Sequence, residues 1–162
     1  PRHAVREVGE GEAELRKILM EIRIMTGALA LGVARAAIED TVRYAGERIQ
    51  FGKPINRFQA VQLKLAEMAT DLEAATHLVH YAAWLKDTRR PHLREAAMAK
   101  LYCSELCMRA TTQAVQLLGG VGYTQDYPVE RMMRDAKVCE IGEGTSEIQR
   151  IVIGRHLVRE TF

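Results

Sequence analysis

Apolar residues along most of this chain recur at alternating steps of three and four, the spacing of one face of an α-helix. The clearest stripe spans residues 58 to 82 and comprises Phe58, Val61, Leu65, Met68, Leu72, Ala75, Val79 and Ala82. The chain has no convincing stretch in which apolar and polar residues alternate, the pattern that would indicate a β-strand. The pattern predicts an all-α fold, a largely antiparallel helical bundle.

The first two predicted helices are separated by a turn. No proline occurs over residues 12–48, where Ala, Leu, Glu and Arg dominate, so we expect one long helix there. The segment "IQFGKPIN" contains helix-breaking Gly52 and Pro54 and predicts a turn. Asn56 followed by Gln59 has the spacing of a capping box, which would open the second helix.

Glycines and loops divide the second half of the chain. A third helix is predicted from Pro91 to Leu118, closed by Gly119 and Gly120. The segment "VGYTQDY" is expected to be a loop and residues 128–137 a short helix. "CEIGEGT" is a second predicted loop, before a last helix over about residues 146–160.

Composition and charge narrow the function class. The 162 residues suffice for one domain with a core, and 48% hydrophobic with 27% charged residues is ordinary for a soluble protein. The net charge of +2 comes from interleaved acids and bases, so we expect no nucleic-acid partner. The longest apolar stretch, "IMTGALALGVA", is shorter than the roughly 20 residues of a membrane span. The sequence shows no signal-peptide pattern, and its odd number of cysteines is a poor basis for disulfides. We therefore predict a cytoplasmic location without membrane insertion.

Three motifs have a structural and a functional interpretation. His77 and His80 share a predicted helix face, but no third ligand is evident nearby, so we predict no metal site. The "GGVG" beginning at Gly119 follows a helix rather than a strand, which favours a helix C-cap over a phosphate loop. Arg48, near a helix C-terminus, could satisfy the helix dipole or present its planar fork to a phosphate.

Glu143 stands between two glycines in "EIGEGTSEIQR". In one interpretation it is an acid stabilised near a helix N-terminus, where Ser146 and Gln149 have capping-box spacing. In the other, the glycines let the backbone pass close to a ligand, and the carboxylate serves proton abstraction next to a carbonyl. The residues alone leave both interpretations open.

Several segments taken together resemble a known family. "GALALGVARAAIEDTVRYAGERIQFGKPINRFQAVQLKLAEMA", "AVQLLGGVGYTQDYPVERMMRDAK" and "IGEGTSEIQRIVIGRH" are similar, in order and spacing, to the C-terminal helical domain of acyl-CoA dehydrogenases. The specific signal is the combination of R-x-x-F-G-K, Q-x-L-G-G-x-G-Y and E-G-T-S-E-I-Q-R. The resemblance implies a helical bundle domain over residues 12–162, with residues 1–11 the tail of a β-domain that is missing from this chain.

The resemblance also implies an activity. The family oxidises an acyl-CoA thioester to its trans-2-enoyl form with FAD, and Glu143 matches the base that removes the α-proton. Its backbone N–H would donate to the thioester carbonyl, with Gly144 leaving room for the thioester. Arg23 falls where the family lines the acyl-CoA pocket. Some members carry the base just before that arginine, but here the position is Ile22, which cannot abstract a proton.

Cofactor contacts are implied in two sets. Thr145 and Glu147 match positions that touch the flavin nucleotide of the same subunit. The second set typically reaches the FAD of a neighbouring subunit and comprises Arg48, Gln50, Phe51, Gln59, Gln116, Gly119 and Gly120. Complete members have further domains that build much of the flavin site, so we expect the isolated chain to bind FAD weakly or not at all.

The implied partners are an acyl-CoA substrate, an electron-transfer partner and further copies of the chain in a dimer or tetramer. Many relatives have an aromatic residue where this sequence has Gly142, which leaves the preferred acyl chain open. One alternative is a catalytically silent helical oligomerisation module. Another is an acyl-CoA oxidase or flavin monooxygenase of the same fold. The silent module differs from the enzyme in the role of Glu143.

Overall fold

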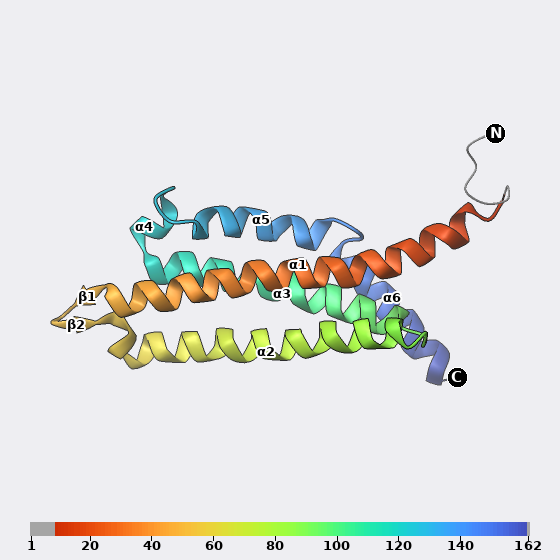
Figure 1. Ribbon diagram of the computed structural model, residues 1–162, viewed down its shortest axis with the longest axis horizontal. Helices are drawn as coiled ribbons and strands as arrows, with labels where there is room; N and C mark the ends of the chain where they lie inside the picture. The colour runs from red at the N-terminus through yellow and green to blue at the C-terminus, as the bar shows by residue number, and fades with distance from the viewer. Residues whose placement is uncertain (1–8, 162) are drawn as a thin grey trace.

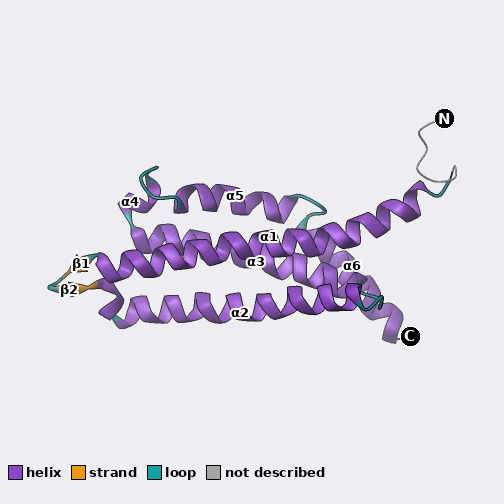
Figure 2. Cartoon of the chain, in the orientation of Figure 1, coloured by secondary structure: helices purple, strands orange, loops and turns teal. Residues whose placement is uncertain are grey.

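The computed structural model describes the backbone of residues 9–161 and the side chains of residues 9–158. Over these residues the chain forms six α-helices and one short hairpin (Figures 1 and 2). The helices are α1 (Gly11–Glu47), α2 (Gln59–Asp87), α3 (Leu93–Leu118), α4 (Gly120–Tyr123), α5 (Val129–Ile141) and α6 (Ser146–Thr161). Between α1 and α2, β1 (Ile49–Gln50) pairs antiparallel with β2 (Lys53–Pro54), and a 3-10 turn follows at Ile55–Arg57. The predicted all-α class is confirmed.

Four helices lie along one another in an elongated bundle (Figure 1). Each of α1, α2, α3 and α5 runs opposite to the one before it, so α1 and α3 are parallel. The most extensive helix contact is between α1 and α3. The hairpin and α4 lie at one end of the bundle, whereas the α5–α6 loop lies towards the other, where α6 packs on α3. The two ends carry different parts of the candidate site.

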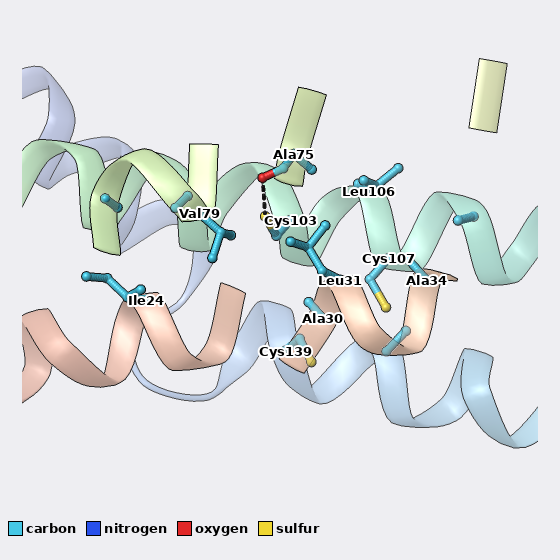
Figure 3. Packing of buried hydrophobic residues seen from close by; sticks show 14 of the residues in the cluster. Ile24, Ala30, Leu31, Ala34, Ala75, Val79, Cys103, Leu106, Cys107 and Cys139 are labelled. Carbon is cyan, nitrogen blue, oxygen red and sulfur yellow. Dashed lines mark hydrogen bonds between the residues drawn. The ribbon is translucent and has the colours of Figure 1, made fainter. Parts of the chain in front are cut away.

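Small residues set the close spacing of the helices. A Cβ atom on Gly27 of α1 would lie 3.3 Å from Val79 of α2 and 3.5 Å from the Ala99 backbone of α3. Figure 3 shows the neighbouring core, where Cys103 donates to the carbonyl oxygen of Ala75 with an Sγ–O distance of 3.8 Å. All three cysteines are free and buried in this core. Protein interiors are close-packed, so these positions leave little room for added atoms.

The helix pattern of the sequence is largely confirmed, with corrections at the ends. Within the 58–82 stripe, Met68, Ala75, Val79 and Ala82 are buried. The helix predicted to end at residue 137 continues to Ile141, because Cys139 is packed in the core at 3% exposure. Part of the predicted "VGYTQDY" loop is helical in α4. The β1–β2 ladder, two residues per strand, is too short to leave a period-two pattern.

The capping interactions differ from the prediction at one helix and agree at another. The capping box of Asn56 and Gln59 is wrong, because the N-cap of α2 is Phe58, whose side chain makes no cap hydrogen bond. Instead the side-chain amide of Gln62 donates to the backbone oxygen of Asn56 at 3.0 Å. Gly119 caps α3 as predicted, with φ 68° and an N–H that donates to Val115.

Among the described residues, no helix has both the length and the apolarity to cross a membrane. The predicted linker of residues 1–11 falls mostly on residues 1–8, outside the described residues, and α1 begins at Gly11. The division of the chain at residue 12 stays a prediction.

Candidate functional site

Glu143 lies in a four-residue loop between the end of α5 and the start of α6. Both Glu143 (φ 57°) and Gly144 (φ 96°) have left-handed backbone conformations, which are uncommon for residues other than glycine. The N–H of Gly142 donates to Val138 at 2.8 Å and closes α5. The Glu143 side chain is exposed, and within residues 9–158 neither its carboxylate nor its N–H has a partner. Its position therefore depends on the backbone of the loop.

Gln149 of α6 holds this loop from one side. Its side chain is 0% exposed, and its Nε2 donates to the carbonyl oxygens of Gly144 at 2.9 Å and Glu143 at 3.5 Å. A Cβ atom on Gly144 would lie 2.8 Å from that nitrogen. Glycine at position 144 thus provides both the left-handed backbone and the space for Gln149.

The N-terminus of α6 is capped by Thr145, so the predicted capping box of Ser146 and Gln149 is wrong. The amide of Ile148 donates to the Thr145 hydroxyl at 3.4 Å, a long contact. Ser146 is buried, and its hydroxyl has no partner in the described part of the chain. Hydrogen bonds from its own amide and from the Thr145 hydroxyl lower the pKa of Glu147. Thr145 and Glu147, both predicted flavin contacts, therefore form one linked pair.

Two buried cations lie behind the loop. Lys100 of α3 is 0% exposed, and its Nζ donates to the backbone oxygen of Glu140 at 3.3 Å. Burial lowers the pKa of Lys100; Arg23 lowers it further, whereas Cys139, Glu140 and Glu147 raise it. Burial also lowers the pKa of Arg23, whose Nε has no partner among the described residues. The predicted substrate residue Arg23 is thus electrostatically coupled to Lys100 of α3, which in turn contacts the end of α5.

Lys100 contacts the end of α5 although no motif in the sequence points to it, and Gln149 holds the loop rather than capping α6. A signal for Lys100 was present, since steps of four and three lead from Ala96 to Lys100, Cys103 and Cys107 on the buried face of α3. A lysine in such a register is unusual, because lysine is almost never fully buried without a partner. The spacing of Gln149 from Ser146 predicts half of a capping box, and the hydrogen bonds from Gln149 back to the loop have no local sequence signature.

The second set of predicted cofactor residues lies at the opposite end of the bundle. We call it the hairpin group: Arg48, Gln50, Phe51, Gln59, Gln116, Gly119 and Gly120, all exposed. Phe51, at φ 50° and 92% exposure, meets Phe58 edge to face. The 13-residue α5 separates this group from Thr145 and Glu147, a length of roughly 20 Å at 1.5 Å per residue. One chain does not bring the two predicted sets together (Figure 1).

The remaining candidates have structural explanations. Gly122 of the "GGVG" motif has no room for a side chain, since a Cβ would lie 2.6 Å from Leu118 Cβ. Gly120, in contrast, has open space around it. His77 pairs with Glu73 at 3.3 Å. In the described part of the chain no group of three His, Cys, Asp or Glu side chains is placed to hold a metal ion.

The sequence of this chain matches a known protein family and several of its members. The family model for the C-terminal domain of acyl-CoA dehydrogenases matches residues 9–158. Benzylmalonyl-CoA dehydrogenase of Aromatoleum aromaticum is 60% identical over 152 residues, which cover 94% of this chain and 40% of that protein. A probable acyl-CoA dehydrogenase of Bacillus subtilis is 57% identical over 137 residues, covering 85% of this chain and 36% of that protein.

The fold is likewise shared. The structure of butyryl-CoA dehydrogenase from Megasphaera elsdenii superposes with a TM-score of 0.93 at 47% identity, covering 94% of this chain and 40% of that one. The chain thus spans about 40% of the length of these relatives. From its motifs, its helical architecture and these matches, the chain belongs to the acyl-CoA dehydrogenase family, within which it corresponds to the C-terminal domain.

Proposed function

We propose that this chain acts as the C-terminal domain of an FAD-dependent acyl-CoA dehydrogenase, in which Glu143 removes the α-proton of an acyl-CoA thioester. The observation that carries the proposal is that the functional groups of Glu143 are free while its loop is held in place. Its carboxylate and its N–H are both without partners in the described structure, on a loop whose neighbouring carbonyl oxygens are held by buried side chains. A base needs such a free and positioned carboxylate.

The chemistry uses both free groups of Glu143. An α-proton becomes acidic enough for a carboxylate only when the thioester carbonyl is polarised, and a backbone N–H aimed at that oxygen supplies the polarisation. The Glu143 carboxylate takes the α-proton, and the electron pair of that C–H bond forms the new Cα=Cβ bond as hydride leaves the β-carbon. FAD, when bound, accepts that hydride.

The arrangement of the two cofactor sets supports a site shared between subunits. Thr145 and Glu147 would contact the flavin nucleotide beside Glu143. Arg48 in the hairpin group presents an exposed planar cation suited to a pyrophosphate, and Phe51 an exposed ring suited to stacking. Because α5 separates the two sets, the hairpin group would serve the FAD of a neighbouring copy. We therefore propose that the working form is a homo-oligomer.

Exposed apolar side chains support this association. Leu15, Ile18, Met25 and Leu29 on α1 are all more than half exposed. Exposed apolar surface of this kind is typical of sites that contact another protein surface. An acyl-CoA substrate, an electron-transfer partner and a cytoplasmic location complete the proposal, and the names of the relatives support the substrate class without fixing the acyl chain.

The test replaces Glu143 by Gln in an enzyme with complete flavin sites, made by joining this chain to the N-terminal remainder of its 60% identical relative. Reduction of bound flavin by a saturated acyl-CoA is followed by absorbance. Removing the base should slow reduction by roughly 10²–10⁴-fold while FAD content stays the same. Asp135→Asn, on the exposed surface of α5, is the matched control. Undiminished dehydrogenation by Glu143→Gln would instead favour the silent oligomerisation module.

A further inference from the structure

Lys100 stands at a position where the fold would accept an apolar residue. Its neighbours along the buried face of α3 are Ala96 and Cys103, and the lysine itself is 0% exposed. Burying an ammonium group is unfavourable unless it is hydrogen-bonded or paired. Its ammonium group donates to the backbone oxygen of Glu140, in the last turn of α5. The unfavourable burial of the Lys100 ammonium group is thus offset by a hydrogen bond to one carbonyl group near the Glu143 loop.

That carbonyl lacks its usual donor because of the loop itself. In a continuing helix the oxygen of Glu140 would accept from the N–H of Gly144, four residues on. The chain instead turns left-handed at Glu143 and Gly144, and α5 ends at Ile141. Carbonyls of a last helical turn are left without partners and carry partial negative charge. The Lys100 ammonium supplies both a donor and an opposite charge.

The loop is therefore held at two points by buried side chains. Lys100 from α3 binds the carbonyl three residues before Glu143, and Gln149 from α6 binds the carbonyl of the residue after it. Both anchors are 0% exposed. They reach the loop from different helices, so a shift of the loop relative to the bundle must break one or both hydrogen bonds.

We propose that Lys100 is a positioning residue for Glu143, fixing the end of α5 so that the loop presents the carboxylate and N–H in one place. The inference rests on the proposed function of Glu143 as base. A purely structural lysine would affect the stability of the whole bundle. A positioning lysine affects the loop and the rate of proton removal.

The first experiment compares amide hydrogen exchange in variants of this chain. Lys100→Met removes the ammonium and keeps an apolar chain of similar length. Ser104→Ala is the matched control, because Ser104 is also fully buried on α3 but donates only within its own helix. The reporters are the N–H of Gly142, bonded to Val138, and the N–H of Gln149, bonded to Thr145.

Lys100→Met should speed exchange of both reporters roughly tenfold, the effect of losing one hydrogen bond that holds the loop. The N–H of Arg48, bonded to Tyr44 at the other end of the bundle, should not change. Equal acceleration at Arg48, or an effect on the reporters no larger than that of Ser104→Ala, would show a general structural role and overturn the proposal.

The second experiment measures turnover in the joined enzyme. Lys100→Met should lower kcat on the order of 100-fold, the effect of a misplacement near 1 Å, and leave KM and FAD content nearly unchanged. Ser104→Ala should keep both constants. An unchanged kcat in Lys100→Met, or an equal loss in Ser104→Ala, would contradict the positioning role. If the parent enzyme shows no dehydrogenation, the proposed function fails, whereas the exchange comparison still decides whether Lys100 holds the loop.

Discussion

Replacing Gly144 by alanine adds one methyl group where the backbone and a neighbouring side chain both oppose it. Gly144 has φ 96°, and a left-handed conformation costs an L-residue about 1–2 kcal/mol. The new Cβ would lie 2.8 Å from Gln149 Nε2, so Gln149 must move and give up its 2.9 Å hydrogen bond to the Gly144 oxygen. That loss adds roughly 0.5–1.5 kcal/mol. The sum is roughly 1.5–3.5 kcal/mol of lost stability.

Thermal unfolding of the chain, followed by circular dichroism, measures this cost. For a domain of this size we expect the Tm of Gly144→Ala to fall by roughly 3–14 °C. Gly154→Ala is the matched control, since Gly154 lies in α6, the helix that follows the loop, with nothing within 4 Å of an added Cβ. That change should stabilise the chain by about 0.5–1 kcal/mol, because alanine favours a helix interior over glycine.

Measuring Gly144→Ala in a second genetic background separates the backbone strain from the loss of the Gln149 hydrogen bond. In a Gln149→Ala background there is no amide to displace, so Gly144→Ala should cost only the backbone term of about 1–2 kcal/mol. Gly144→Ala as stable as the parent would refute the assignment of this glycine to the loop geometry. A cost of equal size in both backgrounds would refute the role of Gln149.

Two further predictions concern the core. Gly122→Ala should destabilise the chain by about 1–3 kcal/mol in urea unfolding, because its Cβ would lie 2.6 Å from Leu118 Cβ, whereas Gly120→Ala, with open space around it, should change little. Burial raises the pKa of the Cys103 and Cys107 thiols from 9.0 to about 12, so the unfolded chain loses these protons first and stability should fall as pH rises from about 9 towards 12. Each thiol contributes at most about 1.4 kcal/mol per pH unit, and a pH dependence unchanged in Cys103→Ala would contradict this origin.

The helices were predictable because their signals are local and repeated. The stripe from Phe58 to Ala82 needs only its spacing to be assigned to one helix face, and the structure buries four of its residues, from Met68 to Ala82. Helix ends were less predictable, since they depend on contacts far away in the sequence. Cys139 continues α5 beyond residue 137 because it packs against α1 and α3 residues of the core, which the loop-like text around it does not reveal.

The loop that carries the candidate site was predictable in part, because its signal is also local. Glu143 is marked by its two glycines, and its loop lies between the two helices that were expected on either side. Lys100 lies 43 positions earlier, and nothing local connects it to that loop. The Gln149 contact depends on how α6 meets the end of α5. Polar anchors of this kind are determined by tertiary packing, so a single sequence indicates them only as polar residues in an apolar register.

The direction of the anchoring hydrogen bonds is suited to proton abstraction. Lys100 and Gln149 are both donors, and both bind carbonyl oxygens of the loop region. An acceptor in either place would instead compete for backbone N–H groups, including that of Glu143. Because the anchors bind only carbonyl oxygens, they leave the N–H and the carboxylate of Glu143 free, as their proposed roles in polarising a thioester carbonyl and taking a proton require. The loop is therefore held by a buried lysine and a buried amide, and neither the carboxylate nor the N–H of the proposed base is used to hold it.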